Sequence, residues 1–172
     1  AIKVLPGEGG DPVSDSRFRT QSEILRTMSH PGLIRYLDSF CWTPGEWDEA
    51  TCLVMEFMEG ETLETRLKQY PKGMPWPQVY AAFKQCLEGL IQAREQGLIH
   101  RDLKPSNVLV TVRDGEPVPK IIDFGIAKII DLSLEDTTLF ETQGEAVGTP
   151  AYMSPEQAHG SADVDTRADI YS

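Results

Sequence analysis

The chain has 172 residues, 40% of which are hydrophobic, and a formal net charge of −11. A chain of this length and composition is able to bury a hydrophobic core, which excludes the disordered and fibrous classes of protein. Its negative charge argues against binding nucleic acids or anionic membranes through net charge, so local groups have to hold any anionic ligand.

The cysteines and the hydrophobic runs are typical of a cytoplasmic protein. Cys41, Cys52 and Cys86 have no metal-ligand spacing, and an odd number of cysteines favours reduced thiols over a disulfide framework. The alternative is a pair between Cys41 and Cys52 across a hairpin. No hydrophobic run approaches the roughly 20 residues that span a bilayer, and no signal peptide is recognisable. We therefore expect a cytoplasmic segment, and a membrane anchor elsewhere in the full-length chain is left open.

The first part of the chain favours β-strands. A strand is predicted at 1–5, and hydrophobic residues spaced three and four apart predict a helix over 17–29 after a Gly- and Pro-rich loop. The sequence HPG at 30–32 ends that helix, because a residue before proline is displaced from helical angles. Two further strands are predicted at 33–40 and 51–58.

The remainder favours helices and one hairpin. A short helix is predicted over 59–70 and a long one over 77–96, and a β-hairpin over 107–125. Regular periodicity fades over 126–161. A domain boundary is expected near 59–60, with a cleft at the junction. The long helix carries one hydrophobic stripe that we expect to be buried: Val79, Phe83, Cys86, Leu87, Leu90 and Ile91.

Residues 100–107 read HRDLKPSN and concentrate ionisable and amide side chains on a loop before the hairpin. Folding the hairpin back brings Asp102, Asn107 and Asp123 to one edge of the cleft. There Asn107 and Asp123 offer oxygen ligands to a hard divalent cation, and Asp102 remains available to a hydroxyl group. Lys104 is placed to neutralise a phosphate.

This set of motifs resembles that of the eukaryotic-type (Hanks-type) Ser/Thr protein kinases. The chain also contains AIK at 1–3, DFG at 123–125 and GTPAYMSPE at 148–156, with Ser154 in place of the usual alanine. The variant MSPEQA is more similar to the bacterial members. The motifs follow the family's order along the whole chain.

The resemblance implies an α+β, two-lobed protein kinase fold that is incomplete at both ends. Residues 1–59 are then part of the β-rich N-lobe, from the strand lysine through the hinge, and 60–172 are the first part of the helical C-lobe. Because strands before residue 1 and helices after residue 172 are expected to be missing, we expect this fragment by itself to be inactive.

The resemblance also implies roles for the site residues, with ATP and Mg²⁺ as cofactors. Lys3 binds the nucleotide phosphates, and Asp102 orients the substrate hydroxyl and accepts its proton. Lys104 stabilises the transferring phosphoryl group, and Asn107 and Asp123 hold Mg²⁺.

On the adenine side, the resemblance implies that Met55 is the gatekeeper and that Glu56 to Met58 offer backbone groups to the base. Leu109 packs under the adenine ring. Met55 and Leu109 are equally well described as core residues, because the wall of a pocket consists of core side chains that have one face open to the ligand.

The helix acid that pairs with the strand lysine in this family has no clear match. The family's spacing places Gln21 at that position, and Glu23 lies two residues further, roughly 200° around a helix. Either Gln21 accepts a hydrogen bond from Lys3, which we favour, or the helix is rotated or bent and Glu23 is the partner.

Two further residues are expected to support the site. His100 is expected to pack beneath Phe124 as a core histidine and not to act as a base. Asp169 matches the family's helix aspartate that braces the catalytic loop.

The function implied is ATP-dependent phosphoryl transfer to Ser/Thr hydroxyls of protein substrates. The alternatives are a pseudokinase or scaffold of the same fold and a small-molecule kinase, and the segment at 148–156 argues against the latter. The segment between Asp123 and Glu156 is expected to be a phosphorylation switch, with Arg101 binding the phosphate. Thr142 is favoured over Thr137 and Thr138 as its site, and self-association for autophosphorylation is a possible partner interaction.

Overall fold

The computed structural model of the chain describes residues 1–6, 20, 22–43, 50–114, 116–124, 150–159 and 164–172, and every structural statement below refers to these residues. They form two three-stranded sheets, with strand orders β1-β3-β2 and β4-β5-β6, and several helices. All strand pairs within the two sheets are antiparallel.

The first sheet consists of β1 (Ile2–Pro6), β2 (Tyr36–Trp42) and the central β3 (Ala50–Met55). Each confirms a predicted strand, but β2 begins three residues later than expected. The reason is that Ile34 turns toward the second sheet, where its amide donates to the Ile121 carbonyl at 2.9 Å.

The predicted helix before β2 is present, since residues 22–27 are helical. Leu25 and Met28 point into the core and are 2% and 6% exposed. Glu23, by contrast, is exposed. The spacing of the hydrophobic residues therefore identified the buried side of this helix correctly.

The short helix predicted over 59–70 is divided between a strand and a helix. β4 (Glu61–Thr62) pairs with β5, with Glu61 opposite Val110, and α2 (Leu63–Leu67) follows. Thr62 is the N-cap of α2, because its side chain accepts a hydrogen bond from the Thr65 amide at 3.1 Å. Pairing with β5 thus delays the start of the helix.

The long helix α3 (Trp76–Glu95) is present, but the expectation that its hydrophobic stripe is buried is wrong for the largest residues. Phe83, Leu87 and Ile91 are 63%, 48% and 57% exposed. Of the stripe, Cys86 and Leu90 are partly buried and pack against the core, and the fully buried residues of the helix are the small ones, Ala82, Gly89 and Ala93. Small side chains let the helix approach its neighbours closely, and a pattern of hydrophobic residues does not reveal that choice.

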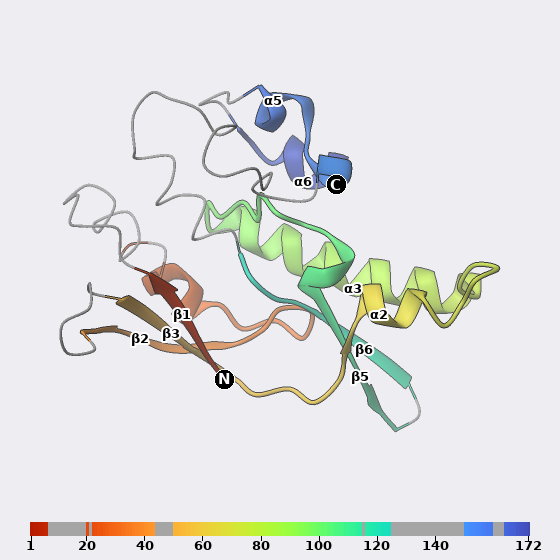
Figure 1. Cartoon of the computed structure of the whole chain (residues 1–172), viewed down its shortest axis with the longest axis horizontal. Coiled ribbons are helices and arrows are strands. Elements are labelled where there is room, and N and C mark those ends of the chain that lie inside the picture. Colours follow the sequence, from red (N-terminus) through yellow and green to blue (C-terminus); the bar gives the residue numbers. More distant parts are fainter. Residues whose placement is uncertain (7–19, 21, 44–49, 115, 125–149, 160–163) are drawn as a thin grey trace.

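The hairpin is confirmed as β5 (Val108–Arg113) and β6 (Glu116–Ile121). It follows the short 3-10 turn η1 (Pro105–Asn107). A second turn, η2 (Pro150–Tyr152), precedes α5 (Pro155–Ala158) and α6 (Arg167–Tyr171). In Figure 1, α3 runs across the middle, with the two sheets on one side of it and α5 and α6 on the other.

One hydrophobic core joins both sheets. Its buried members include Leu25, Leu53, Met55, Val108, Ile121 and Phe124. Cys41, Cys52 and Cys86 are not joined in disulfides, and Phe40, not Cys41, is the register partner of Cys52. None of the described helices combines the length and the hydrophobicity needed to cross a membrane.

Candidate active site

The loop that carries the HRDLKPSN motif is held by a carboxylate from another element. Asp169, in α6, accepts hydrogen bonds from the backbone amides of His100 and Arg101, each at 2.8 Å. Arg101 has a φ of 64°, a left-handed conformation that is uncommon outside glycine and costs free energy. The two hydrogen bonds offset part of that cost. They confirm the expectation that Asp169 braces this loop.

His100 is a buried, neutral ring that contacts Phe124. It is 0% exposed, and its ring centroid lies 4.9 Å from that of Phe124. Its Nε2 lies 2.9 Å from the Ile122 carbonyl, and its Nδ1 accepts the Asp102 amide at 3.2 Å. A carbonyl only accepts and an amide only donates, so the proton is on Nε2. Burial lowers the pKa of His100. The complete burial of the ring against Phe124 confirms that His100 is a core residue.

Asp102 lies between an ammonium group and a side-chain amide. Lys104 Nζ is 2.9 Å from Asp102 Oδ2. Asn107 Nδ2 donates to the same oxygen at 3.0 Å and to the Asp102 carbonyl at 2.8 Å. Both amide hydrogens of Asn107 are therefore directed at Asp102, and its Oδ1 is the atom left to reach a cation. The three side chains singled out on this loop lie together.

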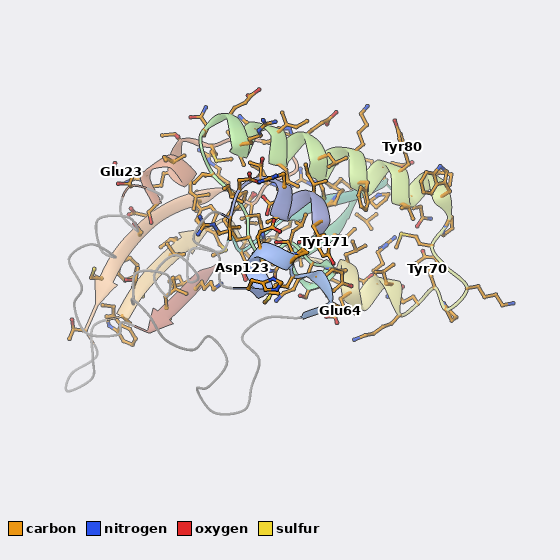
Figure 2. All side chains as sticks on the ribbon, turned by 90° about the horizontal axis from the view of Figure 1, so that it is seen from above. Glu23, Glu64, Tyr70, Tyr80, Asp123 and Tyr171 are labelled. Carbon is orange, nitrogen blue, oxygen red and sulfur yellow. The ribbon has the colours of Figure 1, made fainter. Side chains whose placement is uncertain are left out.

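The end of β6 brings Asp123 to the same place. The amide of Ile122, the residue after β6, donates to the Asn107 carbonyl at 2.9 Å, which sets Asp123 beside the loop. Asp123 Oδ1 is in turn 3.1 Å from Nζ of Lys3 in β1. Figure 2 shows Asp123 near the centre of the molecule. Lys3, Asn107 and Asp123 thus come together from three different elements.

The residues assigned to the adenine side lie at the end of β3, just after it, and on β5. Met55 is buried in the core, and Met58 packs against the same core. Leu109 is half-buried, whereas Val108 and Val110 on either side of it are buried. Leu109 therefore faces away from the core side of β5, and its contact with adenine stays a prediction.

Glu56, directly after β3, uses its side chain to join distant segments. Its amide donates to the Arg35 carbonyl at 2.9 Å, and its Oε1 accepts the Arg35 amide at 3.0 Å and Lys120 Nζ. Burial alone would raise the pKa of Glu56, but the hydrogen bonds from Lys120 and Arg35 outweigh it and lower the pKa. Sequence reasoning missed Lys120. The only sequence feature that could have pointed to Lys120 is its position directly before the hydrophobic residues of the run KII.

Tyr36, in β2, is another residue that sequence reasoning did not single out. It is 4% exposed and lies beside the backbone of Phe124. Burial and the nearby charge of Asp123 raise its pKa. The hydroxyl therefore stays protonated beside the DFG motif. A tyrosine inside a predicted strand was the only signal for it.

Several sequence predictions fall on residues outside the described part of the chain. Gln21 is one of them, so its hydrogen bond to Lys3 stays a prediction. The alternative partner, Glu23, is well separated from Asp123 in Figure 2, and no ion pair between Glu23 and Lys3 occurs among the described residues. Other cases are the candidate phosphorylation sites Thr137, Thr138 and Thr142.

Comparison with known proteins matches residues 1–172 to the protein kinase domain family. The chain is 40% identical over its full length to the serine/threonine-protein kinase pkn2 of Myxococcus xanthus, of which it covers 20%. It is 32% identical over its full length to the serine/threonine-protein kinase PknB of Mycobacterium leprae, of which it covers 26%.

Among solved structures, the chain resembles the PknI kinase domain of Mycobacterium tuberculosis. The two share 28% identity and a TM-score of 0.67, over 98% of this chain and 57% of that domain. The chain thus spans about a fifth to a quarter of the length of the curated relatives quoted above and somewhat more than half of a solved relative.

Proposed function

The chain belongs to the protein kinase domain family, and on this basis we propose that the full-length protein transfers the γ-phosphoryl group of ATP to Ser or Thr hydroxyls of protein substrates. The observation that carries the proposal is the convergence of Lys3, Asp102, Asn107 and Asp123. The names of relatives such as pkn2 and PknB support Ser and Thr as the acceptors. We assign the boundary between the two lobes to residues 59–60.

In this proposal Lys3 and Asp123 act together on the nucleotide phosphates. Lys3 Nζ lies 3.1 Å from Asp123 Oδ1. A phosphate oxygen bound by Lys3 would therefore lie next to the carboxylate that we assign to Mg²⁺. Catalysis is then largely a matter of holding the reacting groups in line and balancing their charge.

The donor set fits Mg²⁺. Among the described residues no three His, Cys, Asp or Glu side chains gather as metal ligands. Asn107 Oδ1 and the Asp123 carboxylate offer two oxygen donors, and Mg²⁺ is typically held by few protein ligands and completed by water and phosphate oxygens. When bound, the ion neutralises negative charge on the phosphate oxygens.

Asp102 is the residue that we assign to the substrate hydroxyl. Lys104 and Asn107 both contact its Oδ2 and so fix the orientation of the carboxylate. The carboxylate held in this orientation is the group that orients the hydroxyl and accepts its proton. Lys104, whose side chain is 18% exposed, is positioned to stabilise the transferring phosphoryl group.

We assign the backbone carbonyl of Glu56 and a backbone group of Met58 to adenine. The carbonyl is chosen for Glu56 because its backbone amide already donates to the Arg35 carbonyl. Met55 and Leu109 then contact the ring from the core side and from β5. The Glu56 side chain takes no part, since it is bound to Lys120.

A pseudokinase or scaffold remains the second candidate, and one observation favours it. The position of the helix acid is occupied by Gln21, so an ion pair with Lys3 cannot form there. The enzyme is the better proposal, because a binding module has no physical need for the base, the phosphate-binding lysine and both metal ligands together.

The test is Asp102→Asn in the full-length protein. We expect phosphoryl transfer to fall by about 10²- to 10⁴-fold, the usual contribution of a general base, while Mg²⁺·ATP affinity is retained. Asp114→Asn is the matched control, since Asp114 lies at the hairpin turn with a φ of 52°, a conformation that asparagine tolerates equally.

Turnover in Asp102→Asn that equals wild type would exclude Asp102 as the base. A wild-type protein that binds Mg²⁺·ATP but phosphorylates neither itself nor peptides with Ser or Thr would favour the scaffold.

A further inference from the structure

A chain of hydrogen bonds connects the start of α5 to the catalytic loop. Ser154 is 0% exposed and is the N-cap of α5, where its Oγ accepts the Gln157 amide at 3.5 Å. In return Gln157 Oε1 accepts the amide and the hydroxyl of Ser154, each at 3.2 Å. This reciprocal capping box fixes which way the Gln157 side-chain amide faces.

The other end of that amide reaches the catalytic loop. Gln157 Nε2 donates to the carbonyl of Arg101 at 2.6 Å, across 56 residues of sequence. Because a peptide unit is planar, the Arg101 carbonyl and the Asp102 amide move as one body. The amide of that unit is held by His100 Nδ1 at 3.2 Å. The peptide plane directly before Asp102 is therefore bound at both of its polar atoms.

These bonds act on a strained residue. Arg101 has a φ of 64°, and its own amide is bound by Asp169 at 2.8 Å. A left-handed conformation outside glycine persists only where the surroundings specify it, and relaxation would rotate the peptide plane that precedes Asp102. Gln157 is the one side chain among the described residues that donates to the oxygen of this plane.

We propose that Gln157 is a positioning residue for Asp102: its amide group fixes the Arg101–Asp102 peptide plane and thereby the direction of the Asp102 carboxylate. The inference rests on the proposed function, in which Asp102 meets the substrate hydroxyl. It also couples the segment that contains Ser154 to the base, so that a shift of α5 is transmitted to Asp102 through one side chain.

The decisive variant is Gln157→Glu in the full-length protein. It keeps an oxygen that accepts from Ser154 but has no N–H to donate to the Arg101 carbonyl. We expect kcat to fall about ten- to a hundredfold with KM for ATP unchanged, because a small displacement of a reacting group is costly whereas Asp102 does not bind the nucleotide. Gln157→Met, which is uncharged and similar in size, separates the lost hydrogen bond from the added charge.

Gln78→Glu is the matched control. Gln78 Oε1 accepts the Tyr70 hydroxyl at 3.3 Å, so this change also preserves an acceptor and removes a donor. Tyr70 lies far from Asp123 in Figure 2, and kcat should not change. Ser154→Ala removes the cap hydroxyl but keeps the Ser154 amide as a donor to Gln157, so its effect on kcat should be smaller than that of Gln157→Glu.

Amide hydrogen exchange of peptides that cover 100–104 gives a readout independent of turnover. We expect faster exchange there in Gln157→Glu and Gln157→Met, with Gln78→Glu equal to wild type. Exchange and kcat equal to wild type in both Gln157 variants would overturn the inference. If wild type transfers no phosphate but the Gln157 variants still exchange faster at 100–104, the proposed function fails and the positioning role stands.

Discussion

His100 and Asp102 belong to one eight-residue motif, yet their surroundings give them opposite roles. The Asp102 side chain is 22% exposed and lies beside Lys104, so part of it is in contact with solvent. His100 is 0% exposed, and both of its ring nitrogens are hydrogen-bonded to backbone groups. Burial of the whole ring lowers the pKa of His100, because the charged form loses its hydration.

The lowered pKa of His100 predicts a loss of stability in mild acid. The unfolded chain takes up a proton near pH 6.5, whereas the folded chain resists it until lower pH, so in that window the unfolded state binds more protons. The free energy of unfolding should therefore decrease as pH falls below about 6.5, by at most about 1.4 kcal/mol per pH unit from this group.

Urea unfolding of wild type and His100→Gln between about pH 7.5 and 5.5 measures this effect. The stability advantage of wild type should shrink as pH falls, because glutamine does not titrate. Parallel pH profiles of wild type and His100→Gln would contradict the prediction.

At the scale of elements, α3 packs through small residues against the turn that precedes β2. A Cβ atom on Gly32 would lie 2.3 Å from the backbone oxygen of Gln85 in α3. A Cβ atom on Gly89 would instead meet side-chain atoms of Leu33, the nearest at 2.8 Å. The first contact is between two backbones, and the second can be relieved by rotating a leucine.

Gly32→Ala should therefore lower the free energy of unfolding more than Gly89→Ala. We expect about 1–3 kcal/mol for Gly32→Ala, the usual cost of overpacking. For Gly89→Ala, a gain of about 1 kcal/mol in helix propensity offsets much of the cost. Denaturant unfolding of the two variants tests the order, and equal or reversed losses would show that α3 shifts freely against this turn.

At the scale of the whole molecule, the two sheets are joined beside the segment that follows β3. Gly32 and Ile34 exchange backbone hydrogen bonds with Ile121 at 2.8 and 2.9 Å, next to the end of β6. Lys120 binds the Glu56 carboxylate and also donates to the Leu33 carbonyl at 3.3 Å. The side chains of Lys120 and Glu56 are 11% and 29% exposed, so water screens this pair only in part.

Lys120→Met should lower the free energy of unfolding by about 1–3 kcal/mol, because it leaves a partly buried carboxylate without its cation. Arg26→Met is the matched control. Arg26 and Asp38 are 3.9 Å apart with side chains 53% and 63% exposed, and such a pair contributes little. Equal losses in urea unfolding would refute the structural role of Lys120, and Glu56→Gln combined with Lys120→Met should recover part of the loss.

The sequence by itself determined the strands of the first sheet and the β5–β6 hairpin, whereas β4 falls where a helix was predicted. Alternating and helical spacing report on local backbone conformation, so β1, β3 and the β5–β6 hairpin followed from nearby residues. The resemblance to kinases named Lys3, Asp102, Asn107 and Asp123, and the tertiary structure places them together.

Only the tertiary structure decided which side of α3 is buried and which groups the side chains of Glu56 and Gln157 bind. The partners Glu56 and Lys120 are 64 residues apart, and Arg101 and Gln157 are 56 apart. No local pattern encodes such contacts, because they depend on how closely whole elements approach each other. On α3 the small residues Ala82, Gly89 and Ala93 allow that approach, whereas Phe83, Leu87 and Ile91 are left exposed.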